Sequence, residues 1–234
     1  MRVRAKANQP DIKPLRGVIR TVYKFDPKRS NVWLEADGDR AYVVKRFESS
    51  PAKQQFLRCL HIHPGQCEIK QHRKLEQMGI PVVPIQEQDW QAGKLCLITP
   101  VMGQSLDRAA QAGAFDQPAA RHALAKALGE LTALLLSKQL FFRDLKCSNI
   151  LMDEDGILRL IDAGSIRKVS AAQLPECLKR MTKLLEKTAV EAAGQSPISF
   201  AISKTDRFRF ARTLLFNLMP NKALTDALEI SRSE

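Results

Sequence analysis

A short polar block near the middle of the chain holds the residues best suited to chemistry. It reads Arg143-Asp144-Leu145-Lys146-Cys147-Ser148-Asn149, so that Asp144 lies five residues before Asn149. Two apolar runs come next, separated by a turn at 153–156, and the second run ends at Asp162-Ala163-Gly164. This order suits phosphoryl transfer, in which Asp144 would orient a hydroxyl while Asn149 and Asp162 would hold Mg²⁺.

Phosphoryl transfer also needs positive charge beside the transferred group, and two lysines are candidates. Lys146, two residues after Asp144, can stabilise the moving phosphoryl group. Lys45 ends the apolar run Val43-Val44-Lys45, from which an ammonium group can reach nucleotide phosphates. Glu68 lies on the next predicted helix and is the preferred ion-pair partner of Lys45, ahead of Glu76. In the structural alternative, Asp144 caps a helix, Asn149 belongs to a turn and Lys45 faces water.

The elements that must position these residues fall into two groups. The first half of the chain is rich in alternating β-branched and aromatic segments, with one helix that begins at Pro64 and ends at Gly79. The strands are expected at 18–25, 32–35, 41–47, 82–85 and 94–99. Residues 1–14 are polar and basic and are expected to form a frayed arm.

The second half of the chain is helical in pattern. After a connector at 100–103, one long helix is expected from Pro118 to Leu140, and two or three more between 171 and 228. The predicted fold class is therefore α+β with two lobes. Residues 1–102 would form a small, antiparallel β-rich N-lobe that binds nucleotide phosphates, and residues 103–234 a mainly helical C-lobe with the catalytic loop.

The composition of the chain limits the classes of binding partner that it can have. The chain has 234 residues, a net charge of +12 and 6% aromatic residues. The charge favours an anionic partner, but no basic and aromatic residues interleave, so nucleic acid is not expected. No apolar run reaches the roughly 18 residues that cross a bilayer. No apolar segment comes after the basic N-terminus, so we expect a cytoplasmic protein without a secretory signal.

Several other residues receive structural interpretations. The five cysteines form no Cys-x-x-Cys pair and are expected to be reduced and mostly buried, although Cys147 in the central block is a candidate reactive thiol. The four histidines lack the spacing of metal ligands. Arg207, Arg209 and Arg212 form either a solvated helix face or a contact for a phosphorylated acceptor.

The central block carries a family resemblance. Residues 143–151 resemble the catalytic loop of the protein-kinase-like superfamily, Asp162-Ala163-Gly164 resembles its metal-binding Asp-Phe-Gly, and Val43-Val44-Lys45 resembles its nucleotide-lysine motif. The resemblance implies a bilobal kinase fold with ATP and Mg²⁺ as cofactors. The site residues that it implies are Asp144 and Lys146 for catalysis, Lys45 and Glu68 for nucleotide binding, and Asn149 and Asp162 for the metal.

A second resemblance is narrower. Residues 68–81 resemble the Glu…Leu…Gly-(Val/Ile)-Pro helix of bacterial lipopolysaccharide core kinases, which phosphorylate Kdo or heptose on the inner core. It implies a hydroxyl of a core sugar as the acceptor. The partner would be a glycolipid at the inner membrane surface, where the basic protein would make peripheral contact with anionic lipid.

The chain departs from the superfamily pattern at several positions. Phe142 stands where most members have His before Arg-Asp, which implies a hydrophobic prop for the loop, and Ala163 replaces the usual Phe. The first 45 residues hold no Gly-x-Gly-x-x-Gly, so another loop must cover the phosphates. No Ala-Pro-Glu motif or long activation segment comes after Asp162, which argues against a phosphorylation-switched protein kinase.

Three alternatives stay open. Lys146 is typical of protein kinases, so an atypical Ser/Thr protein kinase is the second acceptor hypothesis. Small-molecule phosphotransfer is the third, although those enzymes more often carry His-Gly-Asp, which is absent. A non-catalytic, kinase-like scaffold would be expected to have lost at least one of Lys45, Asp144, Asn149 and Asp162, and all four are present.

Overall fold

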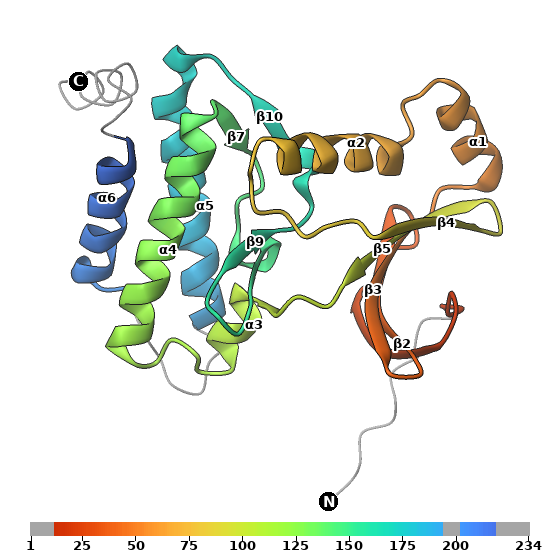
Figure 1. The fold of residues 1–234 in the computed structure, drawn as a ribbon, viewed down its shortest axis with the longest axis horizontal. Coiled ribbons are helices and arrows are strands. Elements are labelled where there is room, and N and C mark those ends of the chain that lie inside the picture. The colour runs from red at the N-terminus through yellow and green to blue at the C-terminus, as the bar shows by residue number, and fades with distance from the viewer. Residues whose placement is uncertain (1–11, 194–201, 219–234) are drawn as a thin grey trace, which may run out of the picture. The chain divides into compact units, whose positions relative to one another are not determined.

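The computed structural model describes residues 12–193 and 202–218, which form two compact units (Figure 1). The first unit comprises the chain up to Ile69 together with Pro84–Val101, and the second comprises Lys70–Val83 together with the chain from Met102 onward. The first holds an antiparallel sheet and the second is mainly helical, so the predicted α+β class is confirmed. The functional division at 102/103 stays a prediction, and the compact units differ from it chiefly in segment 70–83.

The sheet of the first unit has five strands in the order β1-β2-β3-β5-β4, and each neighbouring pair is antiparallel. The strands are β1 (Val18–Lys24), β2 (Ser30–Asp37), β3 (Arg40–Phe47), β4 (Glu87–Gln91) and β5 (Lys94–Pro100). The predicted strand at 82–85 is wrong, since Val82 makes only an isolated bridge to Leu160. Pro81 and Pro84 lack the backbone N–H that a strand ladder needs.

Each face of this sheet carries an apolar cluster, because side chains alternate along the strands. Trp33, Val44 and Ile98 lie in one cluster, and Phe47 and Leu97 lie in the other. Residues 1–11 of the predicted arm lie outside the described residues. The rest of that prediction is wrong at Ile12, which is buried in the first cluster.

The segment after Ile12 is held by a fully buried carboxylate on β2. Glu35 accepts backbone hydrogen bonds from Leu15 (2.9 Å), Arg16 and Gly17 (2.6 Å). It also accepts hydrogen bonds from Trp33 Nε1 (2.8 Å) and Tyr42 Oη (3.0 Å). Burial alone would raise the pKa of Glu35. The hydrogen bonds from Gly17, Leu15, Trp33 and Arg16 outweigh this effect, so the pKa of Glu35 is lowered below its ordinary value. An ionised Glu35 thus fixes the start of β1.

Two helices come after the first three strands. The sequence prediction missed α1 (Pro51–Cys59), which begins after Ser50, whose side chain accepts from Lys53 N at 3.4 Å. A Ser N-cap before Pro at the first helical position is a recognised start signal. Helix α2 (Pro64–Gln77) was predicted, and Gly79 closes it with φ of +75°.

The second unit contains α3 (Leu106–Gln111), α4 (Pro118–Ser137), α5 (Leu174–Ala193) and α6 (Lys204–Leu218). Helix α4 ends before the predicted Leu140, because Gln139 has φ of +55° and strand β7 (Leu140–Phe142) begins there. The small strands β6 (Gln104–Ser105), β8 (Ile150–Met152) and β9 (Leu158–Leu160) form one sheet, and β7 pairs with β10 (Ile166–Lys168). Predicted helix beyond Leu218 lies outside the described residues.

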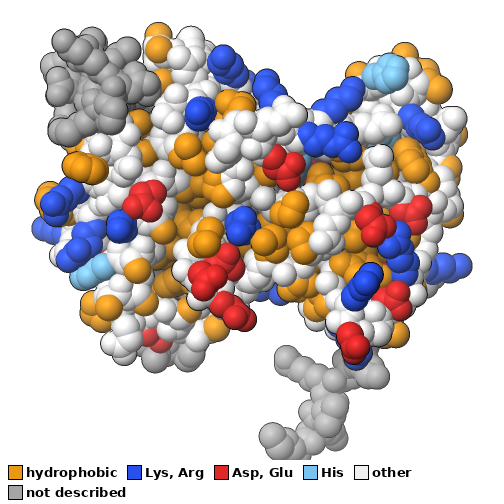
Figure 2. All heavy atoms as spheres, in the orientation of Figure 1, with side chains coloured by type: hydrophobic (Ala, Val, Ile, Leu, Met, Phe, Trp, Pro, Cys, Tyr) orange, Lys and Arg blue, Asp and Glu red, His pale blue; other side chains and the backbone are white. Residues whose placement is uncertain are grey.

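The second unit has one large apolar core, to which α4, α5 and the strands around the catalytic block contribute. On the face shown in Figure 2, basic side chains are spread over each unit rather than gathered in one patch. Among the described residues, no helix is both long enough and apolar enough to cross a membrane.

Candidate functional site

The first unit contains the predicted lysine–glutamate ion pair. Lys45 lies on the central strand β3, opposite Val32 and Leu97, and its Nζ donates to Glu68 Oε1 at 2.9 Å and Oε2 at 2.8 Å. The side chains are 20% and 12% exposed, so the pair is only partly screened by water. The predicted pairing is present, and the role of both residues toward a nucleotide stays a prediction.

Helix α2 brings Glu68 to the lysine because its first turn packs tightly on the sheet. A Cβ at Gly65 would lie 2.5 Å from Leu95 Cδ2 and 2.7 Å from Phe47 Cε2, so any larger residue would have to displace these two buried side chains. His63, fully buried before the helix, contacts Gln54 Oε1 through Nε2 at 3.1 Å. The sequence pattern indicated only a loop at His63 and gave no signal at Gln54, although both hold the entry to α2.

The turn between β1 and β2, at 25–29, holds no glycine. Asp26 Oδ1 accepts the backbone N–H of Lys28 at 3.0 Å and of Arg29 at 3.1 Å. Those two amides are therefore not available to cradle a phosphate. The side chains of Lys28 and Arg29 are exposed, and Arg29 O accepts Glu48 N at 2.9 Å, which places this turn beside a residue three positions after Lys45.

In the second unit, the predicted catalytic block forms a closed loop between β7 and β8. Asn149 is buried, and its Nδ2 donates to the backbone oxygen of Asp144 at 2.9 Å. The same oxygen accepts Lys146 N at 2.9 Å, and Lys146 O accepts Asn149 N at 2.9 Å. Asp144 itself is 43% exposed and pairs weakly with Arg143 at 3.6 Å. The loop is thus fixed from within, while the carboxylate of Asp144 stays accessible.

The hairpin β8–β9 brings Asn149 and Asp162 to the same end. Ile150 is opposite Leu160, and Ile161 N donates to Asn149 O at 3.0 Å, so Asp162 comes directly after this contact. Asp162 has φ of 57° and ψ of 37°, in the left-handed region. Gly164 has no positive φ, and the left-handed residue of this turn is Asp162. Such backbone conformations cluster at functional sites.

The two departures from the superfamily motif are both apolar and buried. Phe142 is fully buried and lies opposite Ile166 in the β7–β10 pair, and Leu145 N donates to Phe142 O at 3.3 Å. Ala163 is also fully buried. Phe142 therefore fits the predicted role of a hydrophobic prop beneath the loop.

The donor set at Asn149 and Asp162 fits a magnesium ion. Both residues offer oxygen atoms, which Mg²⁺ prefers, and a kinase site adds phosphate oxygens and water. Since Nδ2 of Asn149 donates to Asp144, Oδ1 is the atom left for a metal. Among the described residues, no group of three or more His, Cys, Asp or Glu side chains is placed to hold a metal.

The five cysteines are free, and Cys96, Cys147 and Cys177 are buried. Cys59 and Cys67 are exposed, so three of the five thiols are buried, in agreement with the prediction of mostly buried thiols. Cys147 lies in the predicted catalytic loop, where its N–H donates to Thr188 Oγ1 at 3.1 Å and its Sγ contacts Leu185 O at 3.9 Å. Burial raises the pKa of Cys147, which disfavours the reactive thiolate. Thr188 was not singled out from the sequence.

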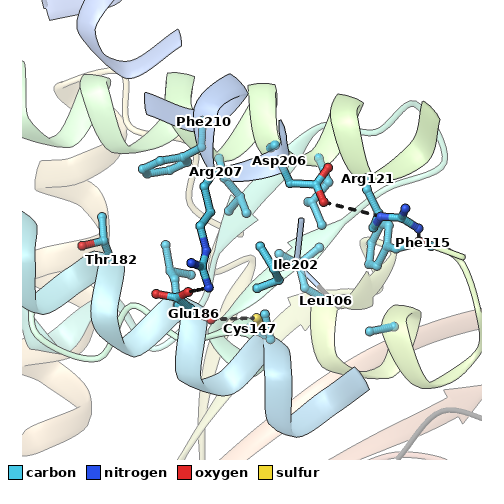
Figure 3. A pocket seen from close by; sticks show the side chains of 16 residues that line it. Leu106, Phe115, Arg121, Cys147, Thr182, Glu186, Ile202, Asp206, Arg207 and Phe210 are labelled. Carbon is cyan, nitrogen blue, oxygen red and sulfur yellow. Dashed lines mark hydrogen bonds and ion pairs between the residues drawn. The ribbon is translucent and has the colours of Figure 1, made fainter. Parts of the chain in front are cut away.

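Behind the loop lies an apolar cavity of about 280 Å³, lined by α3, α4, α5, α6 and Cys147 (Figure 3). Arg207, predicted on a solvated face, lies at this cavity and pairs with Glu186. Arg209 and Arg212 are exposed, as expected for a solvated face. The apolar periodicity of α4 was visible in the sequence, but a cavity depends on how four helices pack.

This fold, with its internally fixed Asp–Asn loop, is that of the kinase-like phosphotransferases. Residues 31–185, more than half of the chain, match the family described as protein kinase domain, and the chain belongs to that family. The chain is similar to the serine/threonine-protein kinase BCK1/SLK1/SSP31 of Saccharomyces cerevisiae, with 43% identity over 56 residues. That match covers 24% of this chain and 4% of the yeast protein. The predicted superfamily is thereby confirmed, and the lipopolysaccharide core kinase resemblance stays a prediction.

Proposed function

We propose that this protein is an ATP- and Mg²⁺-dependent kinase that transfers the γ-phosphoryl group to a hydroxyl of a lipopolysaccharide core sugar, either Kdo or heptose. The observation that carries the kinase proposal is the Asn149–Asp144 hydrogen bond, which fixes the loop and leaves the Asp144 carboxylate accessible. A family member without activity would not need to keep this arrangement together with the Lys45–Glu68 pair.

Each residue has a role in this proposal. Asp144 accepts a hydrogen bond from the attacking hydroxyl, and Lys146 places positive charge beside the transferred phosphoryl group. Lys45, held by Glu68, binds the nucleotide phosphates. Asn149 and Asp162 hold Mg²⁺, which supplies charge neutralisation when bound.

In this proposal, the β1–β2 turn is the segment that lies over the nucleotide phosphates. Its backbone amides at Lys28 and Arg29 are used by Asp26, so the exposed side chains of these two residues would contact the phosphates instead. Lysine and arginine both bind phosphate well. This arrangement replaces a glycine-rich backbone cradle with two cationic side chains.

The segment after Asp162 favours a non-protein acceptor. Only β10 and one short 3-10 turn separate Ser165 from α5, which begins at Leu174. This stretch is too short for the activation segment that positions a peptide in phosphorylation-switched protein kinases. The ending of helix α2 at Gly79-Ile80-Pro81 and the net charge of +12 agree with a phosphorylated glycolipid at the inner face of a membrane.

The second candidate is an atypical Ser/Thr protein kinase. Two observations favour it: Lys146 lies two residues after Asp144, and the similar yeast protein is described as a serine/threonine-protein kinase. A non-catalytic scaffold is the third candidate. Asp162→Ala would remove Mg²⁺-nucleotide binding from an enzyme, but would leave the partner binding of a scaffold largely intact.

The deciding experiment measures ATP consumption with Mg²⁺, with and without deacylated lipopolysaccharide core. Turnover should require the core and fall by about two to four orders of magnitude in Asp144→Asn. Asp155→Asn, an exposed residue of the β8–β9 turn, is the matched control and should behave as wild type. Turnover on a generic protein substrate alone would move the assignment to the second candidate. If the protein neither binds nucleotide nor turns it over under any condition, the catalytic assignment is overturned.

A further inference from the structure

The cavity of the second unit has the size and lining of a binding site for one hydrocarbon chain. Its volume is about 280 Å³, and most of its wall is aliphatic or aromatic. The residues that form this wall include Leu106, Ala110, Leu124, Leu185, Ala189 and Phe210. A dry cavity of about 150 Å³ holds one benzene molecule, so this cavity has room for roughly ten carbon atoms.

One side of the cavity carries a cationic side chain, Arg207, whose present ion pair is weak enough to be exchanged for a ligand. Arg207 pairs with Glu186, and the two side chains are 61% and 46% exposed (Figure 3). An ion pair this exposed contributes little to stability, so Arg207 can exchange Glu186 for an anionic head group at small cost. The second arginine is more firmly held: Arg121, 18% exposed, donates to Phe115 O and Asp116 O and pairs with Asp206 at 3.5 Å.

The cavity also touches the catalytic loop. Cys147, three residues after Asp144 and two before Asn149, lines the cavity. Its N–H donates to Thr188 of α5, and its Sγ contacts the backbone oxygen of Leu185, which lines the cavity as well. A hydrocarbon chain in the cavity would therefore pack against Cys147 and Leu185, through which the loop contacts α5.

We propose that this cavity binds a medium-chain fatty acid, with the chain in the apolar interior and the carboxylate on Arg207. The bound chain fills space beside Cys147 and holds the loop in its active conformation. Binding itself does not depend on the kinase activity, whereas the activating effect rests on the proposed function.

The binding test is calorimetry with the full chain and octanoate, decanoate and dodecanoate, without nucleotide. Affinity should rise about fourfold per added methylene until the cavity is full. Ala125→Leu and Ala189→Leu, which put a larger side chain into the cavity, should each abolish binding. Ala123→Leu, exposed on the same helix as Ala125, should bind as wild type. Absence of binding by folded wild-type protein, or unchanged binding by both filling variants, would overturn the proposal.

The head-group test compares decanoate with decanol. Wild type should bind decanoate several-fold more tightly, and Arg207→Gln should lose this preference, while Arg209→Gln, exposed on the same helix but outside the cavity, keeps it. Equal binding of the two ligands by wild type would refute the anion site. In an assay where wild type turns over, decanoate should raise kcat in wild type and not in Ala125→Leu. Binding without any change in kcat would refute the coupling, and an inactive protein that still binds decanoate would refute only the proposed function.

Discussion

Asn149 is the residue whose substitution separates positioning from metal binding. In Asn149→Asp, an oxygen remains for Mg²⁺, but the Nδ2 donor to Asp144 O is lost and a carboxylate oxygen faces that carbonyl. In Asn149→Ala, both the donor and the metal ligand are lost. The two variants therefore differ in magnesium binding but share the loss of the loop's internal hydrogen bond.

The size of the expected loss in kcat or stability depends on how far Asn149 is buried. Asn149 is 7% exposed, so water cannot replace the lost donor easily. The Asp144 carbonyl keeps the Lys146 N–H, so the loss of this one hydrogen bond costs about 0.5–1.5 kcal/mol. If that free energy is lost from the transition state, kcat falls roughly twofold to 13-fold in Asn149→Asp. If it is lost from folding, Tm falls by about 2–4 °C per kcal/mol for a chain of this size.

The assay is the initial rate of ATP turnover as a function of Mg²⁺, with Tm measured for each variant. Asn149→Asp should show a lower kcat with little change in the Mg²⁺ concentration at half-saturation. Asn149→Ala should show a lower kcat and a higher half-saturating concentration. Asn217→Asp is the matched control, since Asn217 Nδ2 also donates to a backbone oxygen, that of Thr213 at 2.8 Å, but on the exposed side of α6.

A wild-type kcat in Asn149→Asp at saturating Mg²⁺ would refute the reasoning, because the hydrogen bond to Asp144 would then not position the loop. Wild-type magnesium dependence in Asn149→Ala would refute the assignment of Oδ1 as a metal ligand. An equal loss in Asn217→Asp would show that the effect comes from general destabilisation.

Three further predictions concern the first unit. Glu68→Gln breaks the ion pair to Lys45 and should lower kcat/KM for ATP about tenfold in steady-state kinetics. Glu76→Gln, at an exposed position of the same helix, is the control and should leave kcat/KM unchanged. Lys28→Ala with Arg29→Ala should raise KM for ATP several-fold with little change in Tm, and an unchanged KM would contradict their role in phosphate cover. The folded-state pKa of Glu35 is lowered, so its stabilisation is present above the unfolded pKa of about 4.3 and is lost as pH falls through the folded value. In urea titrations, the stability difference between wild type and Glu35→Gln should therefore shrink below about pH 4.3, and a constant difference would refute the ionised anchor.

The local arrangement of the predicted catalytic residues could be expected from the sequence because they lie close together in the chain. Asp144, Asn149 and Asp162 lie within 19 residues, and one hairpin with a turn at 153–156 brings the last two together. The Lys45–Glu68 pair was predictable only as a choice among glutamates on one helix. What decides it is the close approach at Gly65, which depends on side chains from two strands.

Each missed feature lacks the sequence pattern by which its kind is recognised. Helix α1 is short and its only buried residue is the polar Gln54, so its apolar periodicity does not reveal a core face. Strand β4 reads Glu-Gln-Asp-Trp-Gln and lacks the β-branched residues by which strands are recognised. The left-handed Asp162 was also missed, since glycine is the usual residue in that conformation and Gly164 lies two residues away.

The predicted catalytic loop is stabilised by one motif residue, Asn149, and by two residues that the superfamily motif does not specify, Phe142 and Thr188. Phe142 packs fully buried below it, Thr188 accepts the Cys147 N–H from α5, and Asn149 closes it from within. The first of these contacts is apolar, and the other two are hydrogen bonds that do not involve an ionisable side chain. A His at position 142 would instead bring a group that titrates near neutral pH. The loop geometry of this protein should therefore depend less on pH than that of relatives with His before Arg-Asp.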